Sequence, residues 1–199
     1  MVKRIRKSKK KAGFRAQFKK AWEYLEESQN YFYFVLAVFA AAGVVGFFNA
    51  NELRFIDELL EKIIIRSEGL NTAELIFFIL QNNLQSALLG LFSGVFFGVF
   101  SFLVALTNGV ILGYVFERVA GEVGFFQLWR ILPHGIFELP AIFIALGLGV
   151  KLGTAIFAKN IRVEFKRRFF ESVNAFLMIV VPLLVVAAVI EGILISLSS

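Results

Sequence analysis

No charged side chain interrupts residues 75–116, LIFFILQNNLQSALLGLFSGVFFGVFSFLVALTNGVILGYVF. An α-helix rises about 1.5 Å per residue and the hydrocarbon core of a bilayer is about 30 Å thick, so about 20 residues cross it once. The run is therefore long enough for two membrane spans and too short for three. Its division determines how often the whole chain crosses the membrane.

The composition as a whole is that of a membrane protein. Of the 199 residues 58% are hydrophobic, whereas an ordinary soluble domain has about 45–50%. Too little polar chain remains for a separate soluble domain, and we predict an all-α, polytopic membrane protein. The chain has no cysteine, which excludes disulfides, thiolate metal sites and cysteine nucleophiles.

Two divisions of the uncharged run are open. It could form two spans, near 73–91 and 94–117, joined by a tight turn at 92–94, or one span near 84–106 with short flanking pieces. A glycine repeat at spacing four favours one continuous helix, because such a repeat forms a packing stripe on one helix face. Its members are Gly90, Gly94 and Gly98.

The distribution of positive charge favours two spans. Lysine and arginine are dense at 3–20 and again at 159–168, and short loops rich in these residues stay on the cytoplasmic side. Two spans in the uncharged run place both basic segments on the same side, whereas one span places them on opposite sides. We therefore predict five spans, with the N-terminus inside and the C-terminus outside, near 31–48, 73–91, 94–117, 133–157 and 174–197.

The N-terminal flank, residues 1–30, is predicted to be a basic cytoplasmic segment separate from a five-helix transmembrane domain at 31–199. Aromatic and basic side chains alternate in it at helical spacing. This pattern is typical of an amphipathic helix in the inner headgroup region, with its rings toward the lipid. The alternative is a solvated basic tail that only fixes orientation. The proposed lipid-facing residues are Phe14, Arg15, Phe18, Lys19 and Trp22.

The segment between the first two spans, residues 49–71, is polar and net acidic, with apolar residues at helical spacing. It predicts a second amphipathic helix, on the far side of the membrane. The sequence Asn71-Thr72-Ala73-Glu74 resembles a helix start, with Asn71 or Thr72 as the cap.

The central stretch, Pro133 to Pro140, holds the only histidine of the chain and a glutamate four residues later. Four residues make about one helical turn, so His134 and Glu138 would share a face. Pro140 removes a backbone donor, which predicts a kink or a break near it. An ionisable group inside a membrane segment is costly and marks a candidate functional site.

Similar depths in the outer half of the membrane would allow several polar side chains to meet. The candidate cluster contains Asn82, Asn83, Asn108, His134 and Glu138, whose carboxamides can donate to a carboxylate and accept from an imidazole. Two roles stay open, a hydrogen-bonded join between three helices and a polar pocket or proton-coupled path. Glu191 is expected near the outer end of the last span, reaching water. Packing or hinge roles are predicted for Gly90, Gly94, Gly98, Gly109, Gly113, Gly135 and Pro140.

Three short motifs occur in a fixed order: Asn82-Asn83, then Asn108-Gly109 with Gly113, then His134-Gly135 with Glu138-Leu139-Pro140. In this order the chain resembles the stage II sporulation protein M family, integral membrane proteins of bacteria and archaea, over roughly residue 31 to the C-terminus. In spore-forming bacteria the resemblance implies a membrane partner of two peptidoglycan-acting proteins during engulfment.

The sequence offers little for catalysis. One histidine and no cysteine cannot build a histidine-rich metal site, and His134 lacks the second histidine of a metalloprotease helix. Intramembrane hydrolysis, a third possibility, would need a serine set against a base, and nothing in the sequence pairs Ser86, Ser93 or Ser101 with His134. We therefore expect no catalytic residue, metal or cofactor.

The expected function is that of a non-enzymatic scaffold in the cell membrane, organising partner proteins or lipid. The alternative is a small transporter or channel that uses the polar cluster around His134 and Glu138. The expected partners are the lipid bilayer and membrane proteins, including further copies of the chain, and not nucleic acid.

Overall fold

The computed structural model describes residues 13–96, 98–124 and 132–198, with side chains described throughout except at 64, 123, 132–137 and 198. Most of these residues are helical, and they contain no strand. The predicted basic residues before residue 13 lie outside the described residues. The helices are α1 (Phe14–Phe48), α2 (Phe55–Ser67), α3 (Thr72–Phe92), α4 (Val99–Val123), α5 (Leu132–Gly153), α6 (Ile161–Ala175) and α7 (Val181–Ser198).

Five helices of the described residues are long and apolar enough to cross a membrane. This confirms the predicted number of spans and the division of residues 75–116 into two. In the uncharged run, α3 ends at Phe92, one 3₁₀ turn follows, and α4 begins at Val99. The five candidate spans are Phe14–Phe48, Thr72–Val95, Val99–Glu122, Glu138–Phe157 and Ile161–Leu197.

The glycine repeat serves the turn between α3 and α4 instead of a continuous helix. Gly98 has φ +75°, in the left-handed region that favours glycine, and stands directly before α4. A Cβ atom at Gly94 would collide with the backbone of Gly149 in α5. The glycine repeat therefore does not indicate one long helix. Its member Gly94 allows this turn to lie in close contact with α5.

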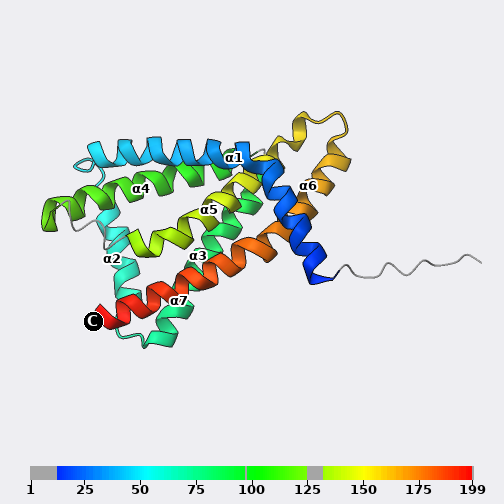
Figure 1. Ribbon diagram of the computed structural model, residues 1–199. Helices are drawn as coiled ribbons and strands as arrows, with labels where there is room; N and C mark the ends of the chain where they lie inside the picture. The colour runs from blue at the N-terminus through cyan, green and yellow to red at the C-terminus, as the bar shows by residue number, and fades with distance from the viewer. Residues whose placement is uncertain (1–12, 97, 125–131, 199) are drawn as a thin grey trace, which may run out of the picture.

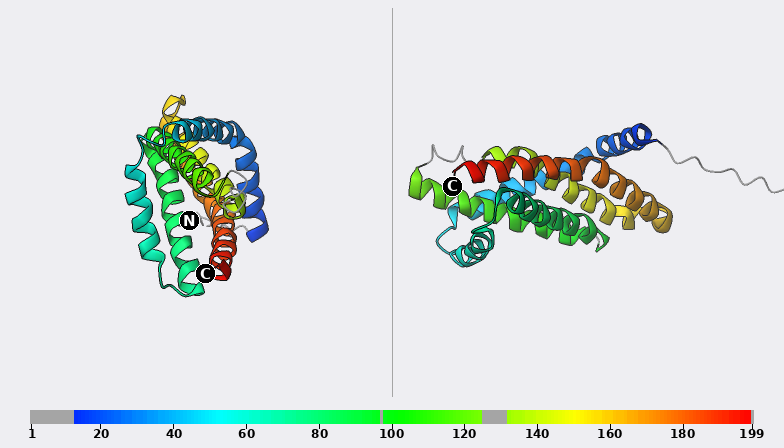
Figure 2. Two further views of the ribbon diagram at one scale, coloured as in Figure 1. Left: turned by 90° about the vertical axis from the view of Figure 1, so that its left-hand side faces the viewer. Right: turned by 90° about the horizontal axis from the view of Figure 1, so that it is seen from below.

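Figures 1 and 2 show α1 and α4 running side by side, with α5 and α7 oblique to them, α3 steeply inclined and α2 across one end. α5 contacts α1 and α4 on one side and α3 and α7 on the other. The C-terminus and α2 lie at one end of the bundle, whereas α6 and the start of α1 lie at the other (Figure 1). We call these the α2 end and the α6 end.

The contact between α1 and α4 depends on glycines on both helices. A Cβ atom at Gly113 would collide with the backbone of Gly43, and one at Gly46 with the backbone of Val110. Gly109 likewise lies against the backbone of Phe39. The two helices therefore approach at backbone distance over several turns, as small residues allow in membrane bundles.

The first helix passes without a break through the predicted boundary at residue 30. Figure 1 shows that α1 bends between its N-terminal part and the part beside α4. Ser28 Oγ donates a hydrogen bond to the carbonyl oxygen of Tyr24, and serine bonding of this kind bends helices. Ala21 and Leu25 are buried in the main apolar core, so this part of the chain packs on the bundle.

Other element boundaries also differ from the expected ones. α5 continues through Pro140, so the predicted break does not occur and a kink is the alternative that remains. α6 leads into α7 through a π-helical turn at Phe176–Val180, just before Pro182, whose missing N–H frees a carbonyl of the preceding turn. α4 extends to Val123, beyond the predicted span end at 117.

Candidate functional site

At the junction of α3, α5 and α7, the structure brings Asn83 beside Glu138. Asn83 is only 6% exposed, and its carboxamide lies next to the Glu138 carboxyl group. Its Nδ2 atom is buried and has no hydrogen-bond partner among the described residues. A buried donor without a partner costs about 1–3 kcal/mol, so Asn83 is a candidate site residue.

Glu191 of α7 is a second acidic residue of the three helices that meet here. Its Oε2 atom is buried without a hydrogen-bond partner in the described part of the chain. The expectation that Glu191 reaches water at the outer end is therefore wrong for this oxygen. The cause is the following residue, Gly192, which packs against Ile76 of α3 and brings this turn of α7 inward. We call Asn83, Glu138 and Glu191 the Glu138–Glu191 group.

The remaining residues of the predicted cluster lie elsewhere or beyond description. Asn82 is exposed. Asn108 donates from Nδ2 to the carbonyl oxygen of Val104 in its own helix, 2.8 Å away, and α4 packs mainly against α1. His134 lies in the first turn of α5, but its side chain, like the surroundings of Gly135, lies outside the described residues.

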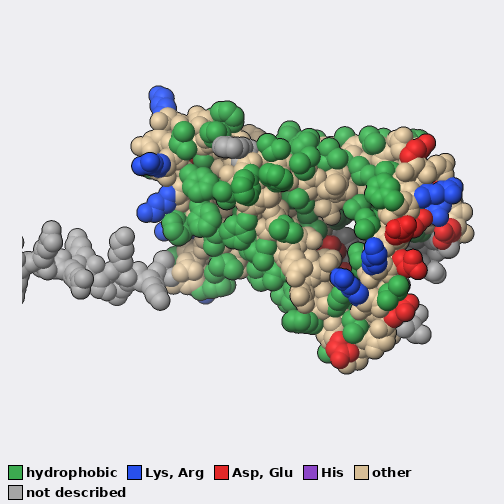
Figure 3. All heavy atoms as spheres, turned by 180° about the vertical axis from the view of Figure 1, so that it is seen from behind, with side chains coloured by type: hydrophobic (Ala, Val, Ile, Leu, Met, Phe, Trp, Pro, Cys, Tyr) green, Lys and Arg blue, Asp and Glu red, His purple; other side chains and the backbone are tan. Residues whose placement is uncertain are grey.

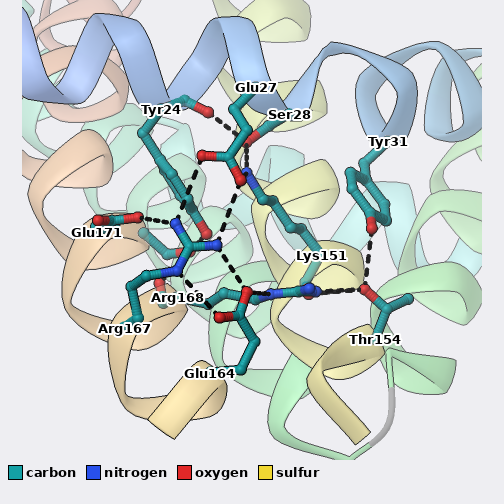
Figure 4. Close-up of polar contacts among 11 residues, drawn as sticks. Tyr24, Glu27, Ser28, Tyr31, Lys151, Thr154, Glu164, Arg167, Arg168 and Glu171 are labelled. Carbon is teal, nitrogen blue, oxygen red and sulfur yellow. Dashed lines mark hydrogen bonds and ion pairs between the residues drawn. The ribbon is translucent and has the colours of Figure 1, made fainter. Parts of the chain in front are cut away.

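At the α6 end, a lysine is buried between three helices. Lys151 of α5 is 2% exposed. Its Nζ atom donates to Ser28 Oγ at 2.9 Å, lies 3.2 Å from Glu27 Oε1, and stands 3.8 Å from the centre of the Tyr24 ring. Figure 4 shows these side chains converging from α1 and α5. A buried ammonium group is tolerated when it is paired and hydrogen-bonded in this way.

Two arginines of α6 extend this network. Arg167 lies 3.3 Å from Glu27 of α1 and 2.9 Å from Glu171. Arg168 donates to the carbonyl oxygen of Lys151 at 2.6 Å and to Thr154 Oγ1 at 2.7 Å. The network therefore joins α6 both to α1 and to the end of α5.

Glu164 closes the network from within α6. Its carboxylate accepts hydrogen bonds from Arg167 at 2.6 Å and Arg168 at 2.8 Å. These bonds lower the pKa of Glu164 from 4.5 to about 2. The residue lies in the charged part of α6, residues 161–171, which we place outside the bilayer. We call the network the α1–α5–α6 clamp; its members are Tyr24, Glu27, Ser28, Lys151, Thr154, Glu164, Arg167 and Arg168.

The clamp is not among the sites predicted from the sequence, although the sequence contains one signal for it. Lys151 is the only charged residue between Glu138 and Lys159, and an isolated lysine in an apolar span is itself a candidate site. Its partners on α1 could not be deduced from the sequence, because they lie more than a hundred positions away and meet it only through packing.

Next to the clamp, the N-terminal part of α1 has an exposed aromatic face. Phe14 is 71% and Trp22 53% exposed, with Phe18 between them, and Lys19 lies on the same part of the helix, 3.7 Å from Glu23. Between this part of α1 and α6 lies an open cleft of about 670 Å³. It is lined by Gln17, Lys20, Glu23, Tyr24, Glu27, Phe170, Glu171 and Asn174.

The described residues offer no metal-binding group of three or more histidine, cysteine, aspartate or glutamate side chains. Ser93 and Ser101 both donate to the carbonyl oxygen of Gly90, at 3.2 and 2.8 Å. These serines therefore secure the turn between α3 and α4 against α3.

A bundle of five apolar helices, with ionisable side chains buried near both ends, defines a polytopic α-helical membrane protein. More narrowly, the chain belongs to the stage II sporulation protein M family, whose model matches residues 35–194. It is also similar to the uncharacterized protein MJ0706 of Methanocaldococcus jannaschii, with 32% identity over 136 residues. That match covers 66% of this chain and 59% of the archaeal protein. No solved structure matches the chain.

Proposed function

We propose that this member of the family is a non-enzymatic scaffold of the cell membrane, which organises partner proteins or lipid through the N-terminal part of α1. The observation that carries the proposal is the α1–α5–α6 clamp. It fixes this part of α1 to the bundle through buried Lys151, while the opposite face keeps Phe14, Phe18 and Trp22 exposed. A protein that only needed a solvated tail would not require a buried ion pair to hold it.

The charge distribution supports a cytoplasmic position for this surface. On the face drawn in Figure 3, hydrophobic side chains lie over the middle, the charged side chains seen at the α6 end are lysine and arginine, and acidic and basic side chains are mixed at the α2 end. The α6 end also carries Glu27, Glu164 and Glu171, which pair with Arg167. Segments rich in lysine and arginine stay inside. We therefore place the N-terminus and α6 inside, and the C-terminus with α2 outside.

The chemistry of the exposed face suits the membrane boundary. Each lysine or arginine near an anionic leaflet contributes about 1 kcal/mol of attraction, and Arg15, Lys19 and Lys20 lie between the aromatic residues. Tryptophan and phenylalanine bury apolar surface at headgroup depth. The same surface would receive an amphipathic segment of a partner protein at that depth.

Photo-crosslinking in native membranes tests the scaffold. A photoreactive amino acid replaces Phe18 in the exposed face, which is 42% exposed, and a control variant carries it at Phe77, a phenylalanine of α3 toward the α2 end that is 66% exposed. We expect discrete protein or lipid adducts from position 18, including adducts to a second copy, and a different pattern from position 77. Identical patterns at the two positions, or no adduct at position 18, would contradict the proposal.

A second candidate, a small transporter or channel, is favoured by the Glu138–Glu191 group. Its buried polar atoms without partners lie where three helices meet, and intramembrane ionisable groups often mark transport paths. Flux of protons or small ions into proteoliposomes, abolished by Glu138→Gln in a folded protein, is the expected result. Absence of any flux in the wild type would remove this candidate and leave the scaffold untouched.

A further inference from the structure

We propose that a cleft between the end of α2 and the start of α3 binds a phospholipid with an amino headgroup, whose phosphate pairs with Arg66 and whose ammonium group pairs with Glu74. The cleft lies at the α2 end, whereas the exposed aromatic face of α1 lies at the α6 end (Figure 1). The inference therefore concerns a second surface and does not depend on the scaffold role.

The cleft has a volume of about 480 Å³, and its charged and apolar side chains follow one another along α3. Arg66 at the end of α2 and Glu74 in the first turn of α3 supply the charges, and Phe77, Phe78 and Gln81 come after them. At about 1.5 Å per residue, Phe77 lies about 8 Å and Gln81 about 14 Å from the start of α3. A phospholipid has the same order of groups, with its charges at the membrane boundary and its chains in the hydrocarbon core.

Packing holds both sides of the cleft in place. Asp57 of α2 accepts a hydrogen bond from Tyr114 at 2.6 Å and lies 3.6 Å from Arg118, so α2 is fixed to α4. Gly69 has φ +75°, which lets the chain turn from α2 into α3. On the α3 side, Phe78 packs against the core that α3 shares with α7. The cleft therefore exists before a ligand enters it, which lowers the cost of binding.

Polar groups of the cleft have hydrogen-bonding capacity that the described residues do not use. Their salt bridges do not include Arg66, and the Gln81 carboxamide has no hydrogen bond to any of them. Glu74 accepts from the backbone N–H of Asn71 through Oε2 at 2.9 Å, which leaves Oε1 for a ligand. A cation, a carboxylate oxygen and a carboxamide thus line one cleft at the membrane boundary.

The two charges favour one kind of headgroup. The guanidinium group of Arg66 can donate two parallel hydrogen bonds to a phosphate. A headgroup with a further negative charge would meet Glu74 and the net acidic segment 49–71. A primary ammonium group instead offers three donors to the Glu74 carboxylate. The quaternary ammonium group of choline has no N–H to donate, so an ethanolamine headgroup fits the cleft best.

The deeper part of the cleft suits the rest of such a lipid. Phe77 is 66% exposed and Phe78 is partly buried beside it, and the two rings offer apolar surface to the hydrocarbon chains. Gln81 can donate to the oxygens that link the chains to glycerol. Without such a partner, its carboxamide would meet hydrocarbon, which is costly for a polar group.

Site-directed photo-crosslinking of the full-length protein in liposomes tests the site. A photoreactive amino acid replaces Phe77 in the cleft, or Phe48, which is 79% exposed and does not line the cleft. The liposomes contain equal amounts of phosphatidylethanolamine and phosphatidylglycerol with the same chains. At position 77 we expect ethanolamine adducts to exceed glycerol adducts about tenfold, the effect of one hydrogen bond to a charged group. At position 48 we expect no such excess.

Variants connect the excess with the two charges. Arg66→Gln and Glu74→Gln should each bring the ratio of adducts at position 77 to that at position 48, and glutamine at 74 preserves the capping box of α3. Lys62→Gln is the matched control, because it removes a positive charge of the same helix from an exposed position that does not line the cleft. It should leave the excess unchanged.

Four results would each overturn the proposal. They are equal ratios at positions 77 and 48, more glycerol than ethanolamine adducts at position 77, an excess that survives Arg66→Gln, and an equal loss of the excess in Lys62→Gln and Arg66→Gln. The last result would show a general attraction between α2 and the membrane surface instead of a site. None of these results bears on adducts from position 18, so the scaffold is tested separately.

Discussion

Lys151 of α5 and Ser28 of α1 lie 123 positions apart and are joined by a hydrogen bond of 2.9 Å from a buried ammonium group. The serine accepts this bond while it donates to the carbonyl oxygen of Tyr24. One side chain therefore links the local bend of α1 to the tertiary structure. The position of the exposed aromatic face depends on this link.

The clamp predicts an asymmetric response to removing each charge. Glu27→Ala leaves the Lys151 ammonium buried without its carboxylate and should destabilise the protein by about 3 kcal/mol. Lys151→Met leaves Glu27 half exposed and still paired with Arg167, so we expect a change within about 1 kcal/mol. Thermal unfolding in detergent compares the two.

The control for this comparison is Lys19→Met, which breaks an exposed ion pair of the same helix and should cost well under about 1 kcal/mol. Equal losses of stability in Glu27→Ala and Lys151→Met would show that the burial of Lys151 has no energetic consequence.

Glu164 predicts an acid-sensitive clamp. Its pKa is lowered from 4.5 to about 2 in the folded protein, so its stabilising contribution is complete above pH 4.5 and is lost as the pH falls toward 2. Glu164→Gln should lower the melting temperature at pH 7 and flatten its dependence on pH between about 5 and 2. If the melting temperature of Glu164→Gln depended on pH between about 5 and 2 as that of the wild type does, this role would be contradicted.

The close contact of α1 and α4 predicts different effects for two glycines of the same helix. Gly113→Ala places a methyl group against the backbone of Gly43 and should destabilise the protein by about 1–3 kcal/mol. Gly121→Ala meets nothing within 4 Å and should stabilise the helix by up to about 1 kcal/mol. Denaturation in detergent measures both, and a destabilising Gly121→Ala would count against this account of α4.

Local patterns predicted much of the fold. Asn71 caps α3, accepting from the backbone of Ala73 and Glu74 while Glu74 accepts from Asn71, as its spacing indicates. The amphipathic pattern of 49–71 corresponds to α2. These features depend on residues a few positions apart, so the sequence contains the whole interaction.

Features that depend on packing were harder to predict. The burial of Glu191 Oε2 depends on the approach of α7 to α3 at Gly192, and helical periodicity does not specify which helices meet. α1 runs through residue 30 as one helix, and Ala21 and Leu25 before this position are buried against the core. Charge indicates on which side of the membrane a segment lies and does not indicate how its helix packs on the bundle.

The sidedness of the bundle is the claim on which the cytoplasmic clamp and the scaffold depend. Because the chain has no cysteine, single cysteines at Glu68, Gly121 and Lys159 can be labelled in intact cells with a membrane-impermeant maleimide. The account predicts labelling at 68 and 121 from outside, and at 159 only after the membrane is opened. Labelling of positions 68 and 159 from the same side would contradict it.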